Sequence, residues 1–291
     1  MPGERREIVI PVRPWFADHR FAGRIVLAAV EAMQILAAAV RAAHPHLEVG
    51  GMRDGRFAKL LEIPPTTTGI DALVESEPLD NGQIRARLMT RTQGKAMARL
   101  VTHCELTFTG TANPGGPGAK WAAAPWPETG ASVSAAHVYR ELVPFGPTYQ
   151  SLQDRLVLRA DAAWGTLLAP EPDHAPAGPL GSPFPLDGAM HAACVHGQCL
   201  VDFVPFPVGF TARHVAKPTR AGKRYRTQAL LQARDDDQLV YDLCILDEED
   251  RVREKVEGLR MRDVSRGRIK PPAWLKAMAQ MTQEGQTMDG A

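Results

Sequence analysis

The stretch WFADHRFAGRIVLAAVEAMQILAAAVRAAHP (residues 15–45) decides the fold, because it contains the longest apolar run of the chain. From Ile25 to Val40, apolar side chains occupy almost every side of a helix, which predicts a buried helix over about 24–43. Immediately before it stand a histidine, His19, and a glycine, Gly23. A titratable side chain and a flexible backbone at the entrance of the most apolar element raise the question of whether this entrance has a function.

Length and charge set the first limits on what the chain does. Its 291 residues are enough for one large domain or two small ones, and 34 basic against 33 acidic residues give a formal net charge of +1. That balance gives no electrostatic argument for a nucleic-acid or anionic-membrane partner. The four cysteines form no CxxC pair and are expected to be reduced, buried thiols.

From the N-terminal residues we expect no targeting signal. The start, MPGERREIVIPVRPW, is charged and lacks an apolar segment followed by a small-residue cleavage site. The run from Ile25 to Val40 contains Glu31 and Gln34 and is too short to span a bilayer comfortably. We therefore expect a cytoplasmic protein with no membrane partner.

Short segments of alternating polarity follow the first helix and predict half-buried strands. Turn-like residues separate them, namely PPTTTG, DNG and TQGK. The predicted strands of this part cover residues 56–63, 71–79, 82–92 and 96–108.

The segment GTANPGGPGAKWAAAPWPETGA (110–131) interrupts this pattern with glycine, proline and alanine, and it predicts a linker. No Gly-Lys-Ser/Thr follows, which argues against a phosphate-binding loop. Beyond it the first pattern returns, with a strand at 165–171, a Pro/Gly-rich loop at 170–185 and a second apolar helix at about 187–200. Further strands are predicted at 210–218, 224–234, 238–247 and 251–264.

Each part therefore has one apolar helix and a set of antiparallel strands, which places the chain in the α+β class. A helix that is apolar all round is explained if a sheet surrounds it. Two antiparallel sheets that each wrap around a central apolar helix would form a double hotdog; periodicity supports the α+β class, and the motifs described below support the wrapping. The predicted units are an N-terminal hotdog with His19 (1–112), a Pro/Gly-rich linker (113–131), a C-terminal hotdog with Asp187 (132–268) and a frayed polar tail (269–291).

The entrances of the two helices carry different ionisable residues. His19 lies in DHRFAG ahead of the first helix, and Asp187 lies in SPFPLDGAMH at the start of the second. Across a pseudo-twofold interface, this histidine and this carboxylic acid would face each other as an acid–base pair. The plainer alternatives are that His19 is an ordinary loop residue and that Asp187 is only the N-cap of its helix.

Four short motifs follow one another between residues 19 and 209. Each is weak alone, but their order and spacing together form a specific pattern. They are HRFAGRIVLA (19–28), FGPTYQ (145–150), DGAMH (187–191) and VPFPVG (204–209).

This pattern resembles the dehydratase domains of modular polyketide synthases, which have the double hotdog fold. The family's HxxxGxxxxP motif matches at His19 and Gly23, with Ala28 in place of the proline. Its DxxxQ or DxxxH motif matches at Asp187 and His191. The YGPxFQ-like and leucine-proline-phenylalanine motifs match at Gly146, Pro147, Gln150, Pro205, Phe206 and Gly209, with Phe145 for the tyrosine and Tyr149 for the phenylalanine.

The resemblance implies removal of water from a 3-hydroxyacyl thioester to give the 2-enoyl thioester. It assigns the Cα proton to His19, whose neutral imidazole, with a reference pKa of about 6.5, is a suitable base. It assigns protonation of the leaving hydroxyl to Asp187, and burial among apolar residues favours the neutral form of a carboxyl group. A backbone N–H at Gly23 would stabilise the thioester oxygen. Other supporting or substrate-binding residues are Phe145, Gly146, Pro147, Tyr149, Gln150, His191, Pro205 and Phe206.

The segment HAACVHGQC (191–199) offers four nitrogen and sulfur ligands in a short span. On one helix they do not converge on a tetrahedral ion, so we expect no metal. The absence of a Gly-rich dinucleotide motif fits a reaction that needs no cofactor. The basic segment KPTRAGKRYR (217–226) is either a solvated loop or a docking surface for an acidic carrier protein.

The resemblance leaves several functions open on the same scaffold. The first is a dehydratase acting on chains carried by acyl carrier protein, or by coenzyme A, in polyketide or fatty acid biosynthesis. A cyclase or isomerase with a similar His/Asp pair is the second, and a non-catalytic protein that binds acyl chains or scaffolds an assembly is the third. A homodimer is suggested by the resemblance alone.

Overall fold

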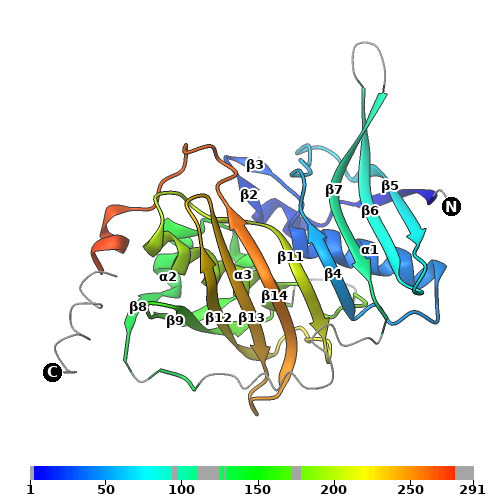
Figure 1. The fold of residues 1–291 in the computed structure, drawn as a ribbon. Helices are drawn as coiled ribbons and strands as arrows, with labels where there is room; N and C mark the ends of the chain where they lie inside the picture. The colour runs from blue at the N-terminus through cyan, green and yellow to red at the C-terminus, as the bar shows by residue number, and fades with distance from the viewer. Residues whose placement is uncertain (1–2, 94–97, 111–124, 128, 172–177, 279–291) are drawn as a thin grey trace.

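The computed structural model describes residues 3–93, 98–110, 125–127, 129–171 and 178–278 (Figure 1). Within these residues one antiparallel sheet of 12 strands runs through the whole molecule, in the order β1-β5-β6-β7-β4-β11-β14-β13-β12-β10-β9-β8. The strands are β1 (Glu4–Pro11), β4 (Gly51–Arg56), β5 (Gly69–Pro78), β6 (Ile84–Gln93), β7 (Ala98–Phe108), β8 (Ala131–Ser134), β9 (Leu152–Leu158), β10 (Ala162–Leu168), β11 (Phe206–Val215), β12 (Arg224–Arg234), β13 (Gln238–Leu246) and β14 (Val252–Arg262).

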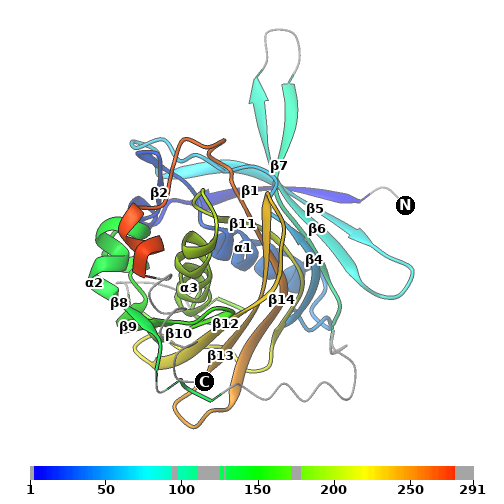
Figure 2. The ribbon, with the colours of Figure 1, turned by 60° about the vertical axis from the view of Figure 1, so that its left-hand side comes forward.

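Two helices lie against the inner face of this sheet, α1 (Ala29–Ala43) and α3 (Phe184–Leu200). Figures 1 and 2 show the sheet curving past both helices, with strands from the N-terminal half around α1 and strands from the C-terminal half around α3. Residues 184–198 of α3 are all buried. The two predicted apolar helices are therefore enclosed by antiparallel sheet, and the two predicted sheets are joined into one.

The order of the strands is the same in both halves when it is read outward from the centre. From the central pair β4 and β11, the N-terminal half continues as β7, β6, β5, β1, and the C-terminal half as β14, β13, β12, β10. In each half the central strand is the one that follows the helix. This arrangement is a pseudo-twofold repeat whose axis passes between β4 and β11.

The first helix begins later than the sequence suggests. Arg20–Phe21 (β2) pairs with Arg24–Ile25 (β3) in a small hairpin, and α1 starts only at Ala29. The turn of this hairpin has positive φ angles at Ala22 (48°) and Gly23 (79°). The apolar pattern continues ahead of the helix because Val26, Leu27 and Ala28 are buried in a non-helical, extended segment.

The predicted strand at 56–63 is wrong, because β4 lies at Gly51–Arg56. This strand pairs with β7 on one side and β11 on the other. Gly55 allows the close packing, since a Cβ atom there would overlap the Phe210 ring. The other predicted strands correspond to observed ones within a few residues, whereas β1, β8 and β9 had no separate prediction.

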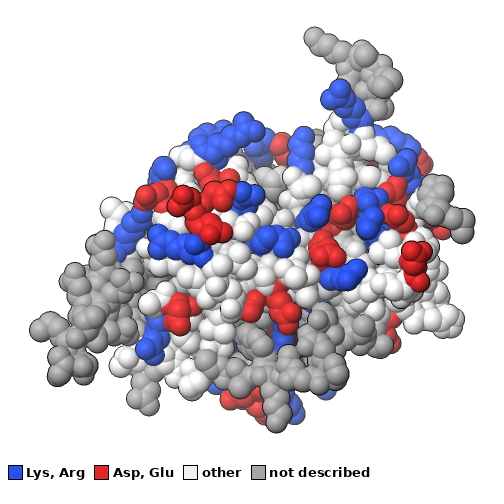
Figure 3. Space-filling model, viewed as in Figure 1, with Lys and Arg blue, Asp and Glu red and all other residues white. Residues whose placement is uncertain are grey.

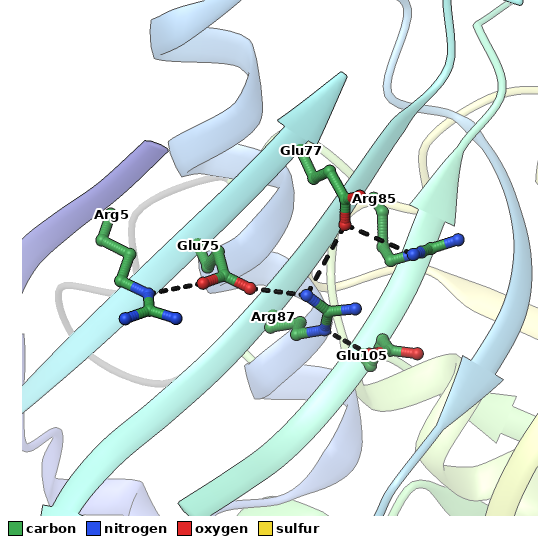
Figure 4. Close-up of polar contacts among 6 residues, drawn as sticks. All are labelled: Arg5, Glu75, Glu77, Arg85, Arg87 and Glu105. Carbon is green, nitrogen blue, oxygen red and sulfur yellow. Dashed lines mark hydrogen bonds and ion pairs between the residues drawn. The ribbon is translucent and has the colours of Figure 1, made fainter. Parts of the chain in front are cut away.

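Arginine and glutamate side chains cross-link the strands of the N-terminal half (Figure 4). Arg5 on β1 and Arg87 on β6 both pair with Glu75 on β5, each at 2.5 Å. Arg87 also pairs with Glu105 on β7. Burial alone would raise the pKa of Glu75, but hydrogen bonds from the two arginines outweigh it and lower that pKa. The network fixes the lateral order of four strands.

The face of the molecule in Figure 3 mixes lysine and arginine with aspartate and glutamate, without a large area of one sign. That pattern agrees with the balanced composition. Within the described residues, no helix has the length and apolar character needed to cross a membrane.

Part of the predicted polar tail is folded. Residues 273–278 are helical, Leu275 is fully buried, and the indole nitrogen of Trp274 donates to Glu141 at 2.9 Å. The expectation of a frayed tail from 269 onward fails for this segment because Leu275 and Trp274 have apolar and polar partners on the body. Residues 279–291 and most of the predicted linker lie outside the described residues, and the domain boundaries stay a prediction.

A buried ion pair lies on the two strands next to the centre of the sheet. The Nε atom of Arg213 on β11 lies 2.7 Å from Oε1 of Glu254 on β14, and the side chains are only 3% and 2% exposed. Arg213 also contacts the sulfur of Met33 on α1 at 3.5 Å. The pair thus links the central strands to the helix that they cover.

We predict that Arg213→Met destabilises the protein by about 3–5 kcal/mol, because Glu254 is left as an unpaired buried charge. Urea unfolding followed by tryptophan fluorescence measures this loss. Replacing both residues with apolar ones is expected to recover most of the stability. The control is Arg24→Met, which breaks an ion pair whose side chains are both 54% exposed, with an expected cost below about 1 kcal/mol. Equal costs for the two single variants would contradict the prediction.

Candidate active site

His19 is held in one orientation by the segment that leads into α1. It follows the short 3-10 helix η1 (Pro14–Asp18), and its carbonyl accepts from the Val26 N–H at 3.1 Å. Its ring Nδ1 lies 2.9 Å from the Val26 carbonyl oxygen. Because a carbonyl oxygen only accepts, Nδ1 carries the ring proton, and Nε2 is left as the basic nitrogen.

Aromatic rings of the FGPTYQ motif surround the imidazole of His19. The Phe145 ring lies 4.3 Å from it, and the Tyr149 ring lies 5.1 Å from it, measured between centroids. Phe145 also lies 5.1 Å from the ring of His191. The motif therefore stands between the histidine of the N-terminal half and the histidine of the C-terminal half.

Asp187 and His191 are neighbours on the first turns of α3, as the four-residue spacing predicts. Both are buried, and Oδ2 of Asp187 lies 2.9 Å from Nε2 of His191, although the two atoms are not aligned as a hydrogen bond. The motif DGAMH therefore places His191 one helical turn after Asp187.

Tyr139, which the sequence analysis missed, supports His191 from the other side. It lies in the short π-helix η2 (Val138–Leu142), and its hydroxyl accepts from the Leu152 N–H at 2.7 Å. The same hydroxyl lies 3.3 Å from Nδ1 of His191. Since its oxygen already accepts, its own proton is available to Nδ1, which favours the His191 tautomer with the proton on Nε2, toward Asp187.

The two halves of the site influence each other electrostatically. Burial lowers the pKa of His19 below its usual 6.5, and the charge of Asp187 and the hydrogen bond to Val26 oppose this shift without cancelling it. The neighbouring His191 lowers the pKa further. His19 is therefore a neutral base at pH 7, within electrostatic range of Asp187 from the opposite half.

Asp18 explains why the FGPTYQ motif lies where it does. Its backbone carbonyl accepts from the Gly146 N–H at 2.7 Å, and its carboxylate accepts from the Thr148 N–H at 2.9 Å. A Cβ atom at Gly146 would overlap this carboxylate, so the position requires glycine. Asp18 thus anchors the aromatic wall, by which we mean the rings of Phe145 and Tyr149 beside His19. In the sequence, only the position of Asp18 next to His19 indicated this role.

Gln34 of α1 anchors the loop just ahead of α3 in a similar way. Its side-chain amide donates to the Gly181 carbonyl at 2.7 Å and accepts from the Leu180 N–H at 3.2 Å. Gly181 is followed closely by the first turn of α3, which carries Asp187. One helix therefore positions the N-terminus of the other.

The remaining predicted site residues shape the surroundings. Gly23 is exposed in the β2–β3 turn, which accounts for the glycine, and its contact with a thioester oxygen stays a prediction. Phe206 packs edge-on against Phe21, which lies two residues after His19, with 5.1 Å between the ring centroids. Pro147 begins the 3-10 helix η3 (Pro147–Tyr149), and the Gln150 amide donates to the Phe145 carbonyl at 2.9 Å. Pro205 is buried beside Gly197 of α3.

The histidines and cysteines of residues 191–199 have separate partners. His196 contacts the Tyr241 hydroxyl and the Arg159 carbonyl at 2.8 and 2.9 Å, while Cys199 contacts a carbonyl of its own helix. Among the described residues, no group of three histidine, cysteine or acidic side chains is arranged to hold a metal ion. All four cysteines of the chain are described, and all are free thiols.

Comparison with known families identifies the chain. The family model for the polyketide synthase dehydratase N-terminal domain matches residues 119–270, which is just over half of the chain. The match includes FGPTYQ, DGAMH and VPFPVG and begins after His19. The chain belongs to this family. The resemblance seen in the sequence is thereby confirmed, and this polyketide synthase dehydratase is an enzyme that removes water from 3-hydroxyacyl intermediates.

Solved structures confirm the fold of this dehydratase. A trans-AT polyketide synthase dehydratase domain from Brevibacillus brevis superposes with a TM-score of 0.70 at 16% identity, over 90% of this chain and 94% of that one. The dehydratase domain from the CurF module of the curacin polyketide synthase gives the same values. A bifunctional dehydratase-cyclase domain of ambruticin biosynthesis has a TM-score of 0.67 at 21% identity, over 89% and 91%. No curated protein matches the chain.

We predict that Gly146→Ala destabilises the dehydratase by about 1–3 kcal/mol, because the new methyl group displaces the Asp18 carboxylate and the aromatic wall. Thermal unfolding measures the loss. In an Asp18→Ala background the same substitution is expected to cost less, since the two nearest overlapping atoms, the carboxylate Oδ1 and Cγ, are gone. Equal costs in the two backgrounds would show that Asp18 is not the reason for the glycine.

Proposed function

We propose that the chain removes water from a 3-hydroxyacyl group held as a thioester on acyl carrier protein and gives the 2-enoyl thioester, with His19 as base and Asp187 as acid. The observation that carries this proposal is the fixed imidazole of His19. Its Nδ1 is bound to the Val26 carbonyl, its Nε2 has no hydrogen-bond partner among the described residues, and its pKa responds to Asp187.

The proposed reaction is a β-elimination. Nε2 of His19 takes the proton from Cα, the electron pair forms the Cα–Cβ double bond, and the Cβ–O bond breaks. The Asp187 carboxyl gives its proton to the leaving hydroxyl, which departs as water. The step leaves an imidazolium and a carboxylate, and their attraction stabilises that state. Transfer of the proton from His19 back to Asp187 restores the starting form.

The neighbours of Asp187 support its role as a proton donor. His191 lies against one oxygen of the carboxyl group and Tyr139 lies behind His191, and burial raises the pKa of the Tyr139 hydroxyl far above its usual value, so that it stays neutral. A neutral Tyr139 orients His191 beside Asp187 without adding charge to the site.

We predict that His19→Ala and Asp187→Asn each lower the rate of dehydration by about 10²–10⁴. Mass spectrometry of 3-hydroxyacyl pantetheine and carrier-protein thioesters measures the loss of water. Since a base works only when deprotonated, the rate of the parent is expected to fall only in the acid range below pH 6.5, because burial lowers the pKa of His19 from that usual value.

The controls for these variants are His46→Ala and Asp161→Asn, two exposed residues away from the site. If both site variants retained the parent rate while thioesters of several chain lengths lost water, the assignment of base and acid would be wrong.

The basic segment at 217–226 lies beside the entrance of α3. Thr219 exchanges hydrogen bonds of 3.0 and 2.9 Å with Ser182, just ahead of that helix. Lys217, Arg220 and Lys223 are exposed, and no ion pair is found for them within the described residues. Their free charge beside the site supports docking of an acidic carrier protein here.

We predict that the triple change of Lys217, Arg220 and Lys223 to Glu raises KM for the carrier-bound substrate about threefold to tenfold at low salt. KM for the pantetheine thioester is expected to stay unchanged, because that substrate lacks the carrier. Arg99→Glu on β7 is a control for charge alone. The same rise for both substrates would place the effect in the active site and argue against docking.

A second function deserves a test because one structural neighbour is a dehydratase-cyclase. Ring closure after dehydration does not change the mass of the enoyl product, so chromatography or proton NMR of the recovered acyl chain distinguishes the two products. A passive acyl-binding protein would change neither the mass nor the structure of the acyl chain.

The cytoplasmic location expected from the sequence, and the homodimer suggested by the resemblance, also belong to this proposal.

A further inference from the structure

Each buried helix brings one carboxyl group into the molecule from its first turns. Glu31 is the third residue of α1, and Asp187 is the fourth residue of α3. They are 9% and 5% exposed. Each residue thus lies in the first turn of the buried helix of its half. The proposed dehydration uses Asp187 and assigns no role to Glu31.

The contacts of Glu31 suit a neutral carboxylic acid. A single oxygen, Oε1, accepts both from the Trp15 indole N–H at 3.0 Å and from the Tyr149 hydroxyl at 3.4 Å. Two donors on one oxygen describe the carbonyl oxygen of an acid and leave Oε2 to carry the proton. An acidic residue in a first helical turn is normally favoured in its ionised form by the helix dipole, but here the side chain is buried.

Electrostatics agree with this geometry. Burial raises the pKa of Glu31 to about 7, and the charge of Asp187 adds to the rise. Hydrogen bonds from Trp15 and Tyr149 and the charge of Arg13 act in the opposite direction and are too weak to restore the usual value. The charged and titratable groups that face Glu31 are therefore Asp187 on α3, Tyr149 on η3 and Arg13 ahead of η1.

Glu31 reaches the proposed base through Tyr149. This tyrosine is fully buried, and its ring lies 5.1 Å from His19 and 5.4 Å from Phe184, at the start of the helix that carries Asp187. Its hydroxyl is bound to Glu31. A change in the charge of Glu31 therefore acts on a ring that touches both sides of the site.

We propose that Glu31 is a positioning residue of this site, which as a neutral acid holds Tyr149 against His19 and on ionising makes the site less active. This inference rests on the proposed function, because it assigns Glu31 to the site in which His19 and Asp187 act. Ionised Glu31 adds a negative charge to the buried site and disfavours the negative charge that develops on the thioester oxygen. The activity consequently falls as Glu31 loses its proton.

The first test compares the pH dependence of kcat/KM for the parent and Glu31→Gln, whose amide keeps the acceptor oxygen. At about pH 6 the two are expected to agree within about threefold, and at about pH 8 the variant is expected to exceed the parent about tenfold. Taking the ratio cancels ionisations that the two proteins share. The control is Glu62→Gln, an exposed carboxyl on the loop that follows β4.

Tyr149→Phe and Arg13→Gln test the same ionisation from its neighbours. Each removes a group that lowers the pKa of Glu31, so the pH at which activity falls is expected to move upward in both. A residue with only a packing role would not move this pH. A ratio of Glu31→Gln to parent that stays constant from about pH 6 to about pH 8 overturns the proposal.

The second test needs no substrate and thus stands apart from the proposed function. Because the folded state holds the Glu31 proton up to about pH 7, its contribution to stability is complete below the unfolded pKa of 4.5 and is lost as pH rises through 7. The Tm of the parent is expected to fall relative to that of Glu31→Gln over this range. Parallel Tm curves would overturn the proposal, whereas diverging curves with no dehydration in any variant would reject only the proposed function.

Discussion

The antiparallel pairing of β4 with β11 is the constraint on which the rest of the structure depends. It joins two sheets into one, and it sets the pseudo-twofold relation between the halves. Gly55 allows the close approach by leaving room for the Phe210 ring. Because each of these strands follows its helix directly, the pairing also decides that the N-termini of α1 and α3 contribute to one site.

The site is assembled from short anchors that cross between the halves. Asp18 holds the loop of Gly146 and Thr148, and Gln34 holds the loop ahead of α3. Both anchors lie in the N-terminal half, close to the proposed base or on the helix behind it. The orientation of the proposed acid thus depends on residues far away in sequence, which is why a small overlap at Gly146 is expected to be felt across the site.

The elements of the fold were accessible from the sequence where periodicity is strong. Alternation located β12 and β13 nearly to the residue, and continuous apolarity located both helices. The strand at 56–63 was misplaced because β4 is defined by partners on both sides and has little alternation of its own. The buried helical segment around Leu275 was missed because polar residues on either side conceal one buried leucine.

The candidate site was accessible only in its motif residues. His19, Asp187 and His191 could be named because their spacing forms a pattern, whereas Glu31 and Tyr139 could not. Their importance comes from burial and from hydrogen bonds to residues 118 and 13 positions away, respectively. Long-range contacts of this kind leave no periodic signal in a single sequence.

The pseudo-twofold repeat within one chain has a consequence for how such an enzyme changes over time. Two identical subunits would place every substitution in both copies of a site at once. Here the halves are covalently joined but differ in sequence, so the first turn of one helix carries Glu31 and that of the other carries Asp187. Each position can therefore change independently. A single mutation can alter the chemistry on one side of the site and leave the residues of the other half unchanged.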